Sequence, residues 1–216
     1  MKGGVLMPVV LVTAFEAFHD EPVNPTEDVL RALPSVFSGA HIVTATLPVR
    51  YGRAFEVLQE ACLSHDPDAV IMLGLAKGRT HISLERIAIN VASSSIADNA
   101  GTIKHEVPLV HDGPPAYFAR INIPQTIKAL QENNIPAQVS NTAGTYVCND
   151  VFYRLLHAIN GAQKPRGVCF VHMPLIPSQV KEDKPLPSLD LVHTVNAVQT
   201  IIQVMLDPGE GGCDDE

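Results

Sequence analysis

Short apolar runs alternate along this chain with stretches of helical periodicity. The apolar runs, several of them rich in valine and isoleucine, are typical of buried strands, and they cover residues 8–13, 41–47, 69–75, 86–92, 137–140 and 167–172. The helical stretches cover residues 25–33, 52–64, 124–133, 148–159 and 189–206. Strands that alternate with helices predict a layered α/β domain with a largely parallel central sheet.

The chain has 216 residues, of which 46% are hydrophobic, and this is enough for one substantial core. We therefore expect a single domain over residues 1–207 and a disordered acidic tail over residues 208–216. Two polar stretches rich in turn-forming residues, 93–117 and 174–187, interrupt the pattern. Both are expected to be surface loops, and long loops of this kind often carry function.

Charge and apolar length exclude several classes of partner. The formal net charge is −8 and the 15 lysines and arginines are scattered, which argues against a nucleic-acid surface. No apolar run approaches the roughly 18 residues of a membrane span. The apolar stretch at residues 5–12 is followed by acidic residues without a signal-peptide cleavage site. We expect a cytoplasmic protein that acts on small molecules or peptides.

Three of the four cysteines are expected to have no chemical role. Cys62 lies in a helical stretch and Cys169 within an apolar run, where a free cysteine packs as a small hydrophobic residue, and Cys213 lies in the acidic tail. In a chain of this length they imply no disulfide scaffold, which fits a reducing compartment.

Cys148 stands where the small and polar residues 140–145 give way to a helical pattern, and an apolar strand ending at His172 follows. A helix N-terminus favours negative charge, so we expect this position to lower the pKa of the thiol. The carboxyl ends of strands and the N-termini of the following helices share one rim of an α/β sheet. Cys148 and His172 are therefore candidates for a nucleophile and its base, although a lone histidine is more often a structural residue.

Glu85 lies within the apolar segment 81–91, where strand periodicity would place it on one face with the apolar residues that alternate after it. A carboxylate on an apolar face is costly unless it is paired, so Glu85 needs a dedicated partner. Two interpretations are open. Arg79 or Arg86 would form a structural ion pair with it, whereas contact with His172 would complete a Cys-His-acid triad.

Two phenylalanines, Phe15 and Phe18, stand between the first expected strand and the first expected helix. The start of that helix is marked by Asn24 as N-cap and Pro25 at the first helical position. The two aromatic rings are either core residues or the walls of an apolar slot for a flat ligand group.

These segments together resemble the pyroglutamyl peptidase I family of cysteine peptidases, also called pyrrolidone-carboxylate peptidases. The resemblance covers nearly the whole chain. Its blocks are VLVTAFEAF (10–18), NPT (24–26), GLAKGR (74–79), ERIAIN (85–90), DNAG (98–101), GPPAY (113–117), SNTAGTYVCN (140–149) and VHMP (171–174).

The resemblance implies a three-layer α/β/α sandwich with a twisted sheet, assembled as a homo-oligomer, a tetramer or a dimer. It implies hydrolysis of the amide bond after an N-terminal pyroglutamyl residue, with no cofactor and no metal. By the same resemblance Cys148 is the nucleophile, His172 the general base and then acid, and Glu85 the orienting carboxylate. A thioester acyl-enzyme follows from acyl transfer to sulfur. Arg79 or Arg86 is expected to help the Cys148 N–H stabilise the oxyanion.

Substrate-binding residues also follow from the resemblance. Phe15, Phe18, Tyr146 and Val147 would enclose the lactam ring, and its polar atoms would be met by backbone groups near Leu75 and by Asn24. Such a slot would reject an ordinary amino terminus, because burying an unpaired ammonium group is costly.

The chain departs from the family pattern at several positions. Where the family usually has Gly-Phe-x-Pro-Phe-Gly-Gly, residues 14–20 read AFEAFHD, so three glycines and a proline are lost. Glycine permits backbone angles that other residues resist, and the placement of this loop decides the shape of the pocket. Lys77 replaces a usual glycine or proline, and Ala100 replaces a common glutamate.

Two alternative functions remain open from the sequence. A nucleoside phosphorylase-like enzyme on a related scaffold would need a phosphate site, for which only Gly78 and Arg79 give a hint. A pyroglutamate-binding protein with reduced turnover would retain the fold and the pocket.

Overall fold

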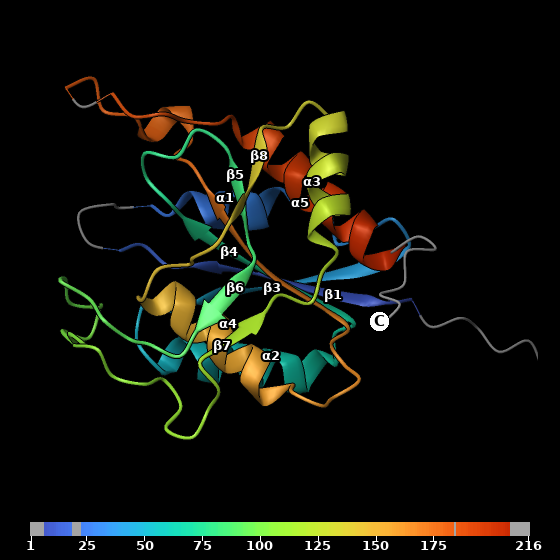
Figure 1. Ribbon diagram of the computed structural model, residues 1–216. Helices are drawn as coiled ribbons and strands as arrows, with labels where there is room; N and C mark the ends of the chain where they lie inside the picture. The colour runs from blue at the N-terminus through green and yellow to red at the C-terminus, as the bar shows by residue number, and fades with distance from the viewer. Residues whose placement is uncertain (1–6, 19–22, 184, 208–216) are drawn as a thin grey trace, which may run out of the picture.

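The central sheet runs through the molecule in the order β2-β3-β1-β4-β9-β5-β8 (Figure 1). The computed structural model describes residues 7–18, 23–183 and 185–207. The strands are β2 (Val36–Phe37), β3 (Ala40–Leu47), β1 (Val9–Phe15), β4 (Ala69–Leu75), β9 (Gly167–Met173), β5 (Ile82–Glu85) and β8 (Ala137–Ser140). Within this sheet β2 is antiparallel to β3 and β5 is antiparallel to β9, whereas the other neighbours are parallel.

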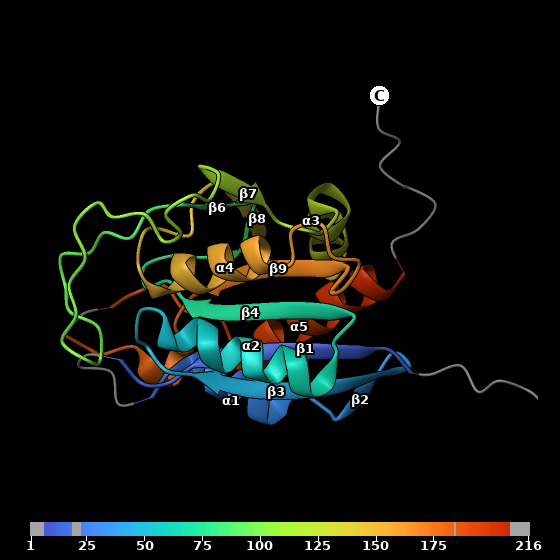
Figure 2. The same ribbon diagram turned by 90° about the horizontal axis from the view of Figure 1, so that it is seen from below.

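Helices cover both faces of the sheet. On one face lie α1 (Pro25–Ala32), α3 (Ile123–Glu132) and α5 (Leu191–Leu206), and on the other lie α2 (Arg53–His65) and α4 (Val147–Ala158). Figure 2 shows α2 and α4 side by side in front of the strands. The predicted three-layer α/β/α sandwich with a largely parallel, mixed sheet is therefore confirmed.

Alternating side chains of the central strands build two cores. Leu11, Val70 and Phe170 pack with α2 and α4, whereas their neighbours Val12 and Ile71 pack on the opposite face. Strands buried on both faces need apolar residues at every position, which explains the continuous apolar runs of the sequence. Because His172 follows Phe170 by two positions, its side chain points to the face covered by α4.

The predicted strand over residues 86–92 is wrong in part. The central sheet takes β5, which ends at Glu85, and the chain then leaves it. The next strand, β6 (Ile87–Ile89), pairs antiparallel with β7 (Ala116–Phe118) in a separate two-stranded sheet. The sequence pattern failed because the alternation of apolar residues is the same in both sheets and does not reveal which neighbour a strand joins.

The other predicted elements lie close to their observed bounds. β4 and β8 begin and end as expected, and α5 begins two residues later than expected. The predicted loop over residues 93–117 contains the start of β7. Cys62 and Cys169 are free thiols, whereas Cys213 and the expected tail over residues 208–216 lie outside the described residues. In the described part of the chain, no helix has the length and apolar character needed to cross a membrane.

Candidate active site

One rim of the sheet carries a cavity of about 590 Å³. β1 ends there at Phe15 and β4 at Leu75, and α4 begins there at Val147, as expected for the carboxyl edge of parallel strands. The residues that line the cavity are Phe15, Phe18, Val23, Asn24, Val49, Leu75, Lys77, Ile96, Tyr146, Val147, Cys148, Leu175, Gln179, Lys181 and Leu186.

All six residues expected to bind substrate line this cavity together with Cys148. Four lining residues that were not predicted come from the stretch after β9, namely Leu175, Gln179, Lys181 and Leu186. The position of that proline-rich stretch directly after His172 was the available signal, because a loop at the end of a central strand must cross the same rim.

Aromatic rings form one wall of the cavity. The ring of Tyr146 lies 5.4 Å from that of Phe18 and 5.4 Å from that of Tyr51, between ring centres. The Tyr146 hydroxyl donates to the Ala97 carbonyl oxygen at 3.0 Å, which fixes the ring against the 93–117 loop. Phe15 lines the cavity and also packs on Phe170 in the core, so both interpretations of this residue hold.

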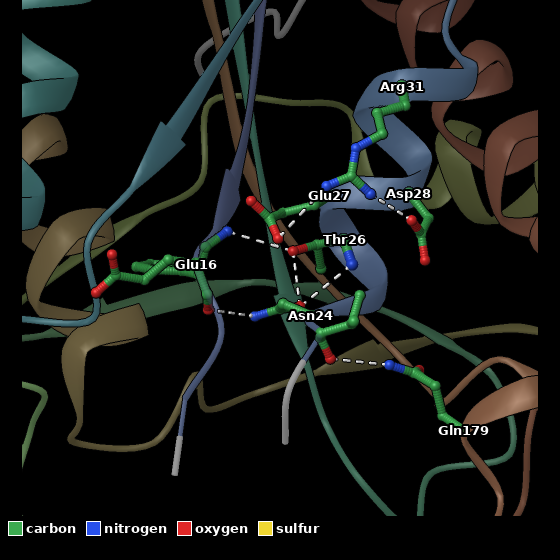
Figure 3. Close-up of polar contacts among 9 residues, drawn as sticks. Glu16, Asn24, Thr26, Glu27, Asp28, Arg31 and Gln179 are labelled. Carbon is green, nitrogen blue, oxygen red and sulfur yellow. Dashed lines mark hydrogen bonds and ion pairs between the residues drawn. The ribbon is translucent and has the colours of Figure 1, made fainter. Parts of the chain in front are cut away.

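Asn24 connects the end of β1 to the start of α1 (Figure 3). Its Oδ1 accepts from the backbone N–H of Thr26 at 3.2 Å and from the Thr26 hydroxyl at 2.8 Å, which confirms the predicted N-cap. Its Nδ2 donates to the Glu16 carbonyl oxygen at 3.2 Å. The Thr26 hydroxyl also accepts from the Phe15 N–H, so this network positions the residues at both ends of the segment between β1 and α1.

Polar contacts hold the described part of the loop that follows β1. Glu16 Oε1 accepts from the Val49 N–H at 3.1 Å and from Asn99 Nδ2 at 2.7 Å, and Asn99 Nδ2 also donates to the Ala17 carbonyl oxygen. Asp98, next to Asn99, accepts from three backbone N–H groups. Burial works to raise the pKa of Asp98, but these donors outweigh it and hold that pKa below its usual value. Residues 19–22 of this loop lie outside the described residues.

Glu85 contacts both of its candidate partners. Its Oε1 atom accepts from His172 Nδ1 at 2.8 Å and from Arg79 Nη1 at 3.0 Å. The Glu85 side chain is fully buried, that of His172 is 7% exposed and that of Arg79 is 29% exposed. Strand register explains the meeting, because Ser83 on β5 pairs with His172 on β9 and Glu85 lies on the same face two residues later. Among the described residues, no ion pair joins Glu85 to Arg86.

The face predicted for Glu85 was wrong, although its burial was expected. The carboxylate does not share a strand face with Ile87 and Ile89, because β5 ends at Glu85 and those residues belong to β6. Its second oxygen, Oε2, is buried and has no hydrogen-bond partner among the described residues.

Cys148 occupies the first turn of α4 and lines the cavity. Burial and, to a smaller extent, the Glu85 carboxylate raise the pKa of its thiol to about 12. The cysteine's own backbone N–H and Arg79 lower that pKa by less. The predicted lowering of the thiol pKa is therefore wrong: the helix N-terminus acts in the expected direction, but desolvation is larger. Among the described residues, no hydrogen bond joins the thiol to His172.

The absence of a side chain at Gly74 leaves space for the His172 ring. Gly74 pairs with His172 across β4 and β9, and a Cβ atom at this position would lie 2.9 Å from His172 Cδ2 and 2.8 Å from Phe170 Cε1. Both distances are shorter than van der Waals contact. A glycine here therefore sets how closely β4 can approach the imidazole ring.

No metal-binding group of three or more His, Cys, Asp or Glu residues occurs in the described part of the chain.

Comparisons with known proteins agree on one family. A family model described as pyroglutamyl peptidase matches residues 8–207. The pyrrolidone-carboxylate peptidase of Thermococcus onnurineus is 43% identical over 197 residues, which cover 91% of this chain and 98% of the relative. That of Cupriavidus taiwanensis is 42% identical over 93% of this chain and 94% of the relative. A mutant pyrrolidone carboxyl peptidase from Pyrococcus furiosus has a similar structure, with a TM-score of 0.89 and 38% identity over 93% of this chain and 99% of its own.

A Gly74→Ala substitution should displace the His172 ring. We expect a loss of about 1–3 kcal/mol in the free energy of unfolding, because an added methyl group overpacks this part of the core. Denaturant unfolding measures the loss, and the imidazole NMR signals of His172 should shift. A Gly144→Ala variant is not a suitable control, because Gly144 has a φ of +77°. Ala88→Gly, a change at a buried position in the separate two-stranded sheet, is the better comparison. Unchanged His172 signals in Gly74→Ala would contradict the prediction.

Proposed function

The chain belongs to the pyroglutamyl peptidase family, and from that premise we propose that Cys148, His172 and Glu85 carry out its reaction. It is a cysteine peptidase that hydrolyses the amide bond after an N-terminal pyroglutamyl residue. The observation that carries the assignment of residues is the buried hydrogen bond from His172 Nδ1 to Glu85 Oε1, at 2.8 Å, on the face of the sheet covered by the helix of Cys148.

The Glu85 contact determines what the imidazole can do. A proton on Nδ1, directed at Glu85, leaves Nε2 of the neutral ring with a free electron pair to accept a proton. Because the pKa of the Cys148 thiol is raised to about 12, the thiol carries its proton at neutral pH. Attack therefore requires that His172 Nε2 take the thiol proton as the sulfur approaches the carbonyl carbon.

The reaction then proceeds in two steps, acylation of Cys148 and hydrolysis of the acyl-enzyme. The sulfur of Cys148 bonds to the pyroglutamyl carbonyl carbon, the C–N bond breaks, and the His172 imidazolium gives its proton to the departing amine. Water then attacks the thioester carbonyl carbon and gives a proton to His172. The C–S bond breaks, His172 returns the proton to the sulfur, and pyroglutamic acid is released.

The Cys148 N–H is the proposed oxyanion donor. We also propose that Arg79 or Arg86 helps this N–H to stabilise the oxyanion. Of the two, Arg79 already donates to Glu85 through Nη1.

The cavity fits a neutral, flat lactam at the end of a peptide. Phe15, Phe18 and Tyr146 line it with apolar surface, and we expect Asn24 and the backbone near Leu75, which line it too, to meet the polar atoms of the lactam. Among the lining residues that the structure describes, none is a carboxylate, so an ordinary ammonium terminus would meet no counterion from them. A volume of about 590 Å³ lies in the range of small-molecule sites and leaves room for the residue after the lactam.

We further propose that residues 1–207 act as one domain in the cytoplasm, as a homotetramer or a dimer. The free state of Cys62, Cys148 and Cys169 supports a reducing compartment. The oligomeric state rests on the family resemblance alone.

Replacing Cys148 with Ser should lower the release of a fluorogenic amine from a pyroglutamyl amide by at least about a thousandfold, because the hydroxyl is a much weaker nucleophile. Iodoacetamide should inactivate the wild-type enzyme, and Cys62→Ser should retain activity. Full activity in Cys148→Ser would refute the assignment. Stabilisation of the wild-type protein by free pyroglutamate without any hydrolysis would instead identify a binding protein.

Glu85→Gln should lower kcat by about a hundredfold or more, because the amide leaves the tautomer of His172 unspecified and the imidazolium unpaired. His172→Ala should lower kcat further, with KM changed little in both variants. Steady-state kinetics on the fluorogenic amide measure both parameters. A Glu85→Gln enzyme with wild-type kcat would show that the carboxylate is only structural.

Asn99→Ala should raise KM about threefold to tenfold while kcat changes less. The substitution removes the hydrogen bonds from Nδ2 to Glu16 and Ala17, each worth about 1 kcal/mol, and so loosens the loop of Phe18. Equal losses in kcat and kcat/KM, with KM unchanged, would contradict this account of the loop.

A further inference from the structure

Two donors share a single oxygen of the buried Glu85 carboxylate. His172 Nδ1 approaches Oε1 to 2.8 Å and Arg79 Nη1 approaches the same atom to 3.0 Å, while Oε2 has no partner among the described residues. We propose that Arg79 is a positioning residue of the reaction, which fixes Glu85 beneath His172 and balances the carboxylate's charge at Cys148. This inference rests on the proposed function of the three residues.

The charge of Glu85 needs a cation that His172 does not supply. The neutral imidazole required for catalysis donates a hydrogen bond but carries no charge. A fully buried carboxylate without a counter-charge is costly, and Arg79 is the residue that forms an ion pair with it. The guanidinium is 29% exposed, so it offsets the carboxylate while part of it remains solvated.

The backbone between β4 and β5 directs Arg79 to this position. The Arg79 N–H donates to the Ala76 carbonyl oxygen at 3.3 Å, closing a turn in which Gly78 has a φ of +87°. Only glycine adopts this conformation without strain. The Ala76 N–H in turn donates to the Met173 carbonyl oxygen at 2.8 Å, which ties the turn to β9 next to His172.

Arg79 and Glu85 act in opposite directions on the nucleophile. Glu85 raises the pKa of the Cys148 thiol and Arg79 lowers it. The tyrosine hydroxyls within electrostatic reach, Tyr51 and Tyr146, have raised pKa values and stay neutral near pH 7. Among the described residues, Arg79 is thus the cation that offsets the penalty that Glu85 imposes on the thiolate.

The chain offers a matched control in Arg154. Its Nε lies 2.6 Å from Oδ1 of the fully buried Asp150, and its side chain is 30% exposed, so this ion pair resembles that of Arg79 and Glu85 in type and burial. Both members belong to α4, the helix of Cys148, yet neither contributes to the shift of the thiol pKa.

The test compares the rate at which iodoacetamide alkylates Cys148 in the native enzyme and its variants, measured by mass spectrometry at a fixed pH of about 8. Below the thiol pKa this rate is proportional to the thiolate fraction. Arg79→Gln and Arg79→Met remove the cation and should slow alkylation about tenfold, which corresponds to one pKa unit. Arg79→Lys retains the charge and should stay within about threefold of wild type, and Arg154→Gln within about twofold.

A purely structural role predicts the opposite sign. If Arg79 only stabilises the fold, its loss loosens the site, exposes the half-buried thiol further and leaves the alkylation rate unchanged or higher. Either result in a folded neutral variant, verified by circular dichroism, would overturn the proposal. Equal slowing in Arg79→Lys and Arg79→Gln would also overturn it, because the charge would then be irrelevant. The two neutral variants and Arg79→Lys provide the test even if one of them does not fold.

Peptidase kinetics provide the second readout. Arg79→Gln should lower kcat on the fluorogenic pyroglutamyl amide with little change in KM, and Arg79→Lys should restore much of it. A rise in KM with unchanged kcat would place Arg79 in substrate binding instead and overturn the proposal. Alkylation requires no substrate turnover, so failure of the proposed peptidase activity would be distinguishable from failure of this inference.

Discussion

The buried carboxylate of Glu85 is the constraint on which the site depends. A charged group with no solvent exposure must be met by donors, and two converge on Oε1: the imidazole of His172 and the guanidinium of Arg79. The hydrogen bond to His172 orients the ring, and the ion pair to Arg79 supplies the opposite charge. The same carboxylate raises the pKa of the Cys148 thiol. It therefore orients the base but makes the thiolate nucleophile harder to form.

The order of strands is what makes this meeting possible. β5 and β9 are separated by about 80 residues of sequence, yet they are antiparallel neighbours, and their register sets Glu85 two positions from the residue opposite His172. On the other side of β9, the absence of a side chain at Gly74 on β4 leaves space for the ring. A thiol whose pKa is raised by burial needs such a fixed base, because little thiolate is present before substrate arrives.

Side chains from several elements hold the described ends of the segment between β1 and α1. Contacts from the side chains of Glu16, Asn24 and Asn99 position this segment after the end of β1 at Phe15 and before the start of α1. Glu16 and Asn24 are close in sequence, whereas Asn99 lies 83 residues from Glu16 and joins the segment to the 93–117 loop. The aromatic wall therefore depends on the 93–117 loop as much as on its own segment.

The sequence by itself determined the elements and the residue types of the site. Apolar runs and helical periodicity located the helices and most strands, because burial and periodicity produce local sequence patterns. The positions of Cys148, His172 and Glu85 within those patterns indicated that they were candidate site residues. The tertiary structure alone decided that β5 and β6 join different sheets and that Arg79 and His172 share one carboxylate oxygen. It also decided that burial outweighs the helix N-terminus at Cys148. Strand partners, shared donors and desolvation depend on which distant segments surround a residue, and no local pattern encodes that.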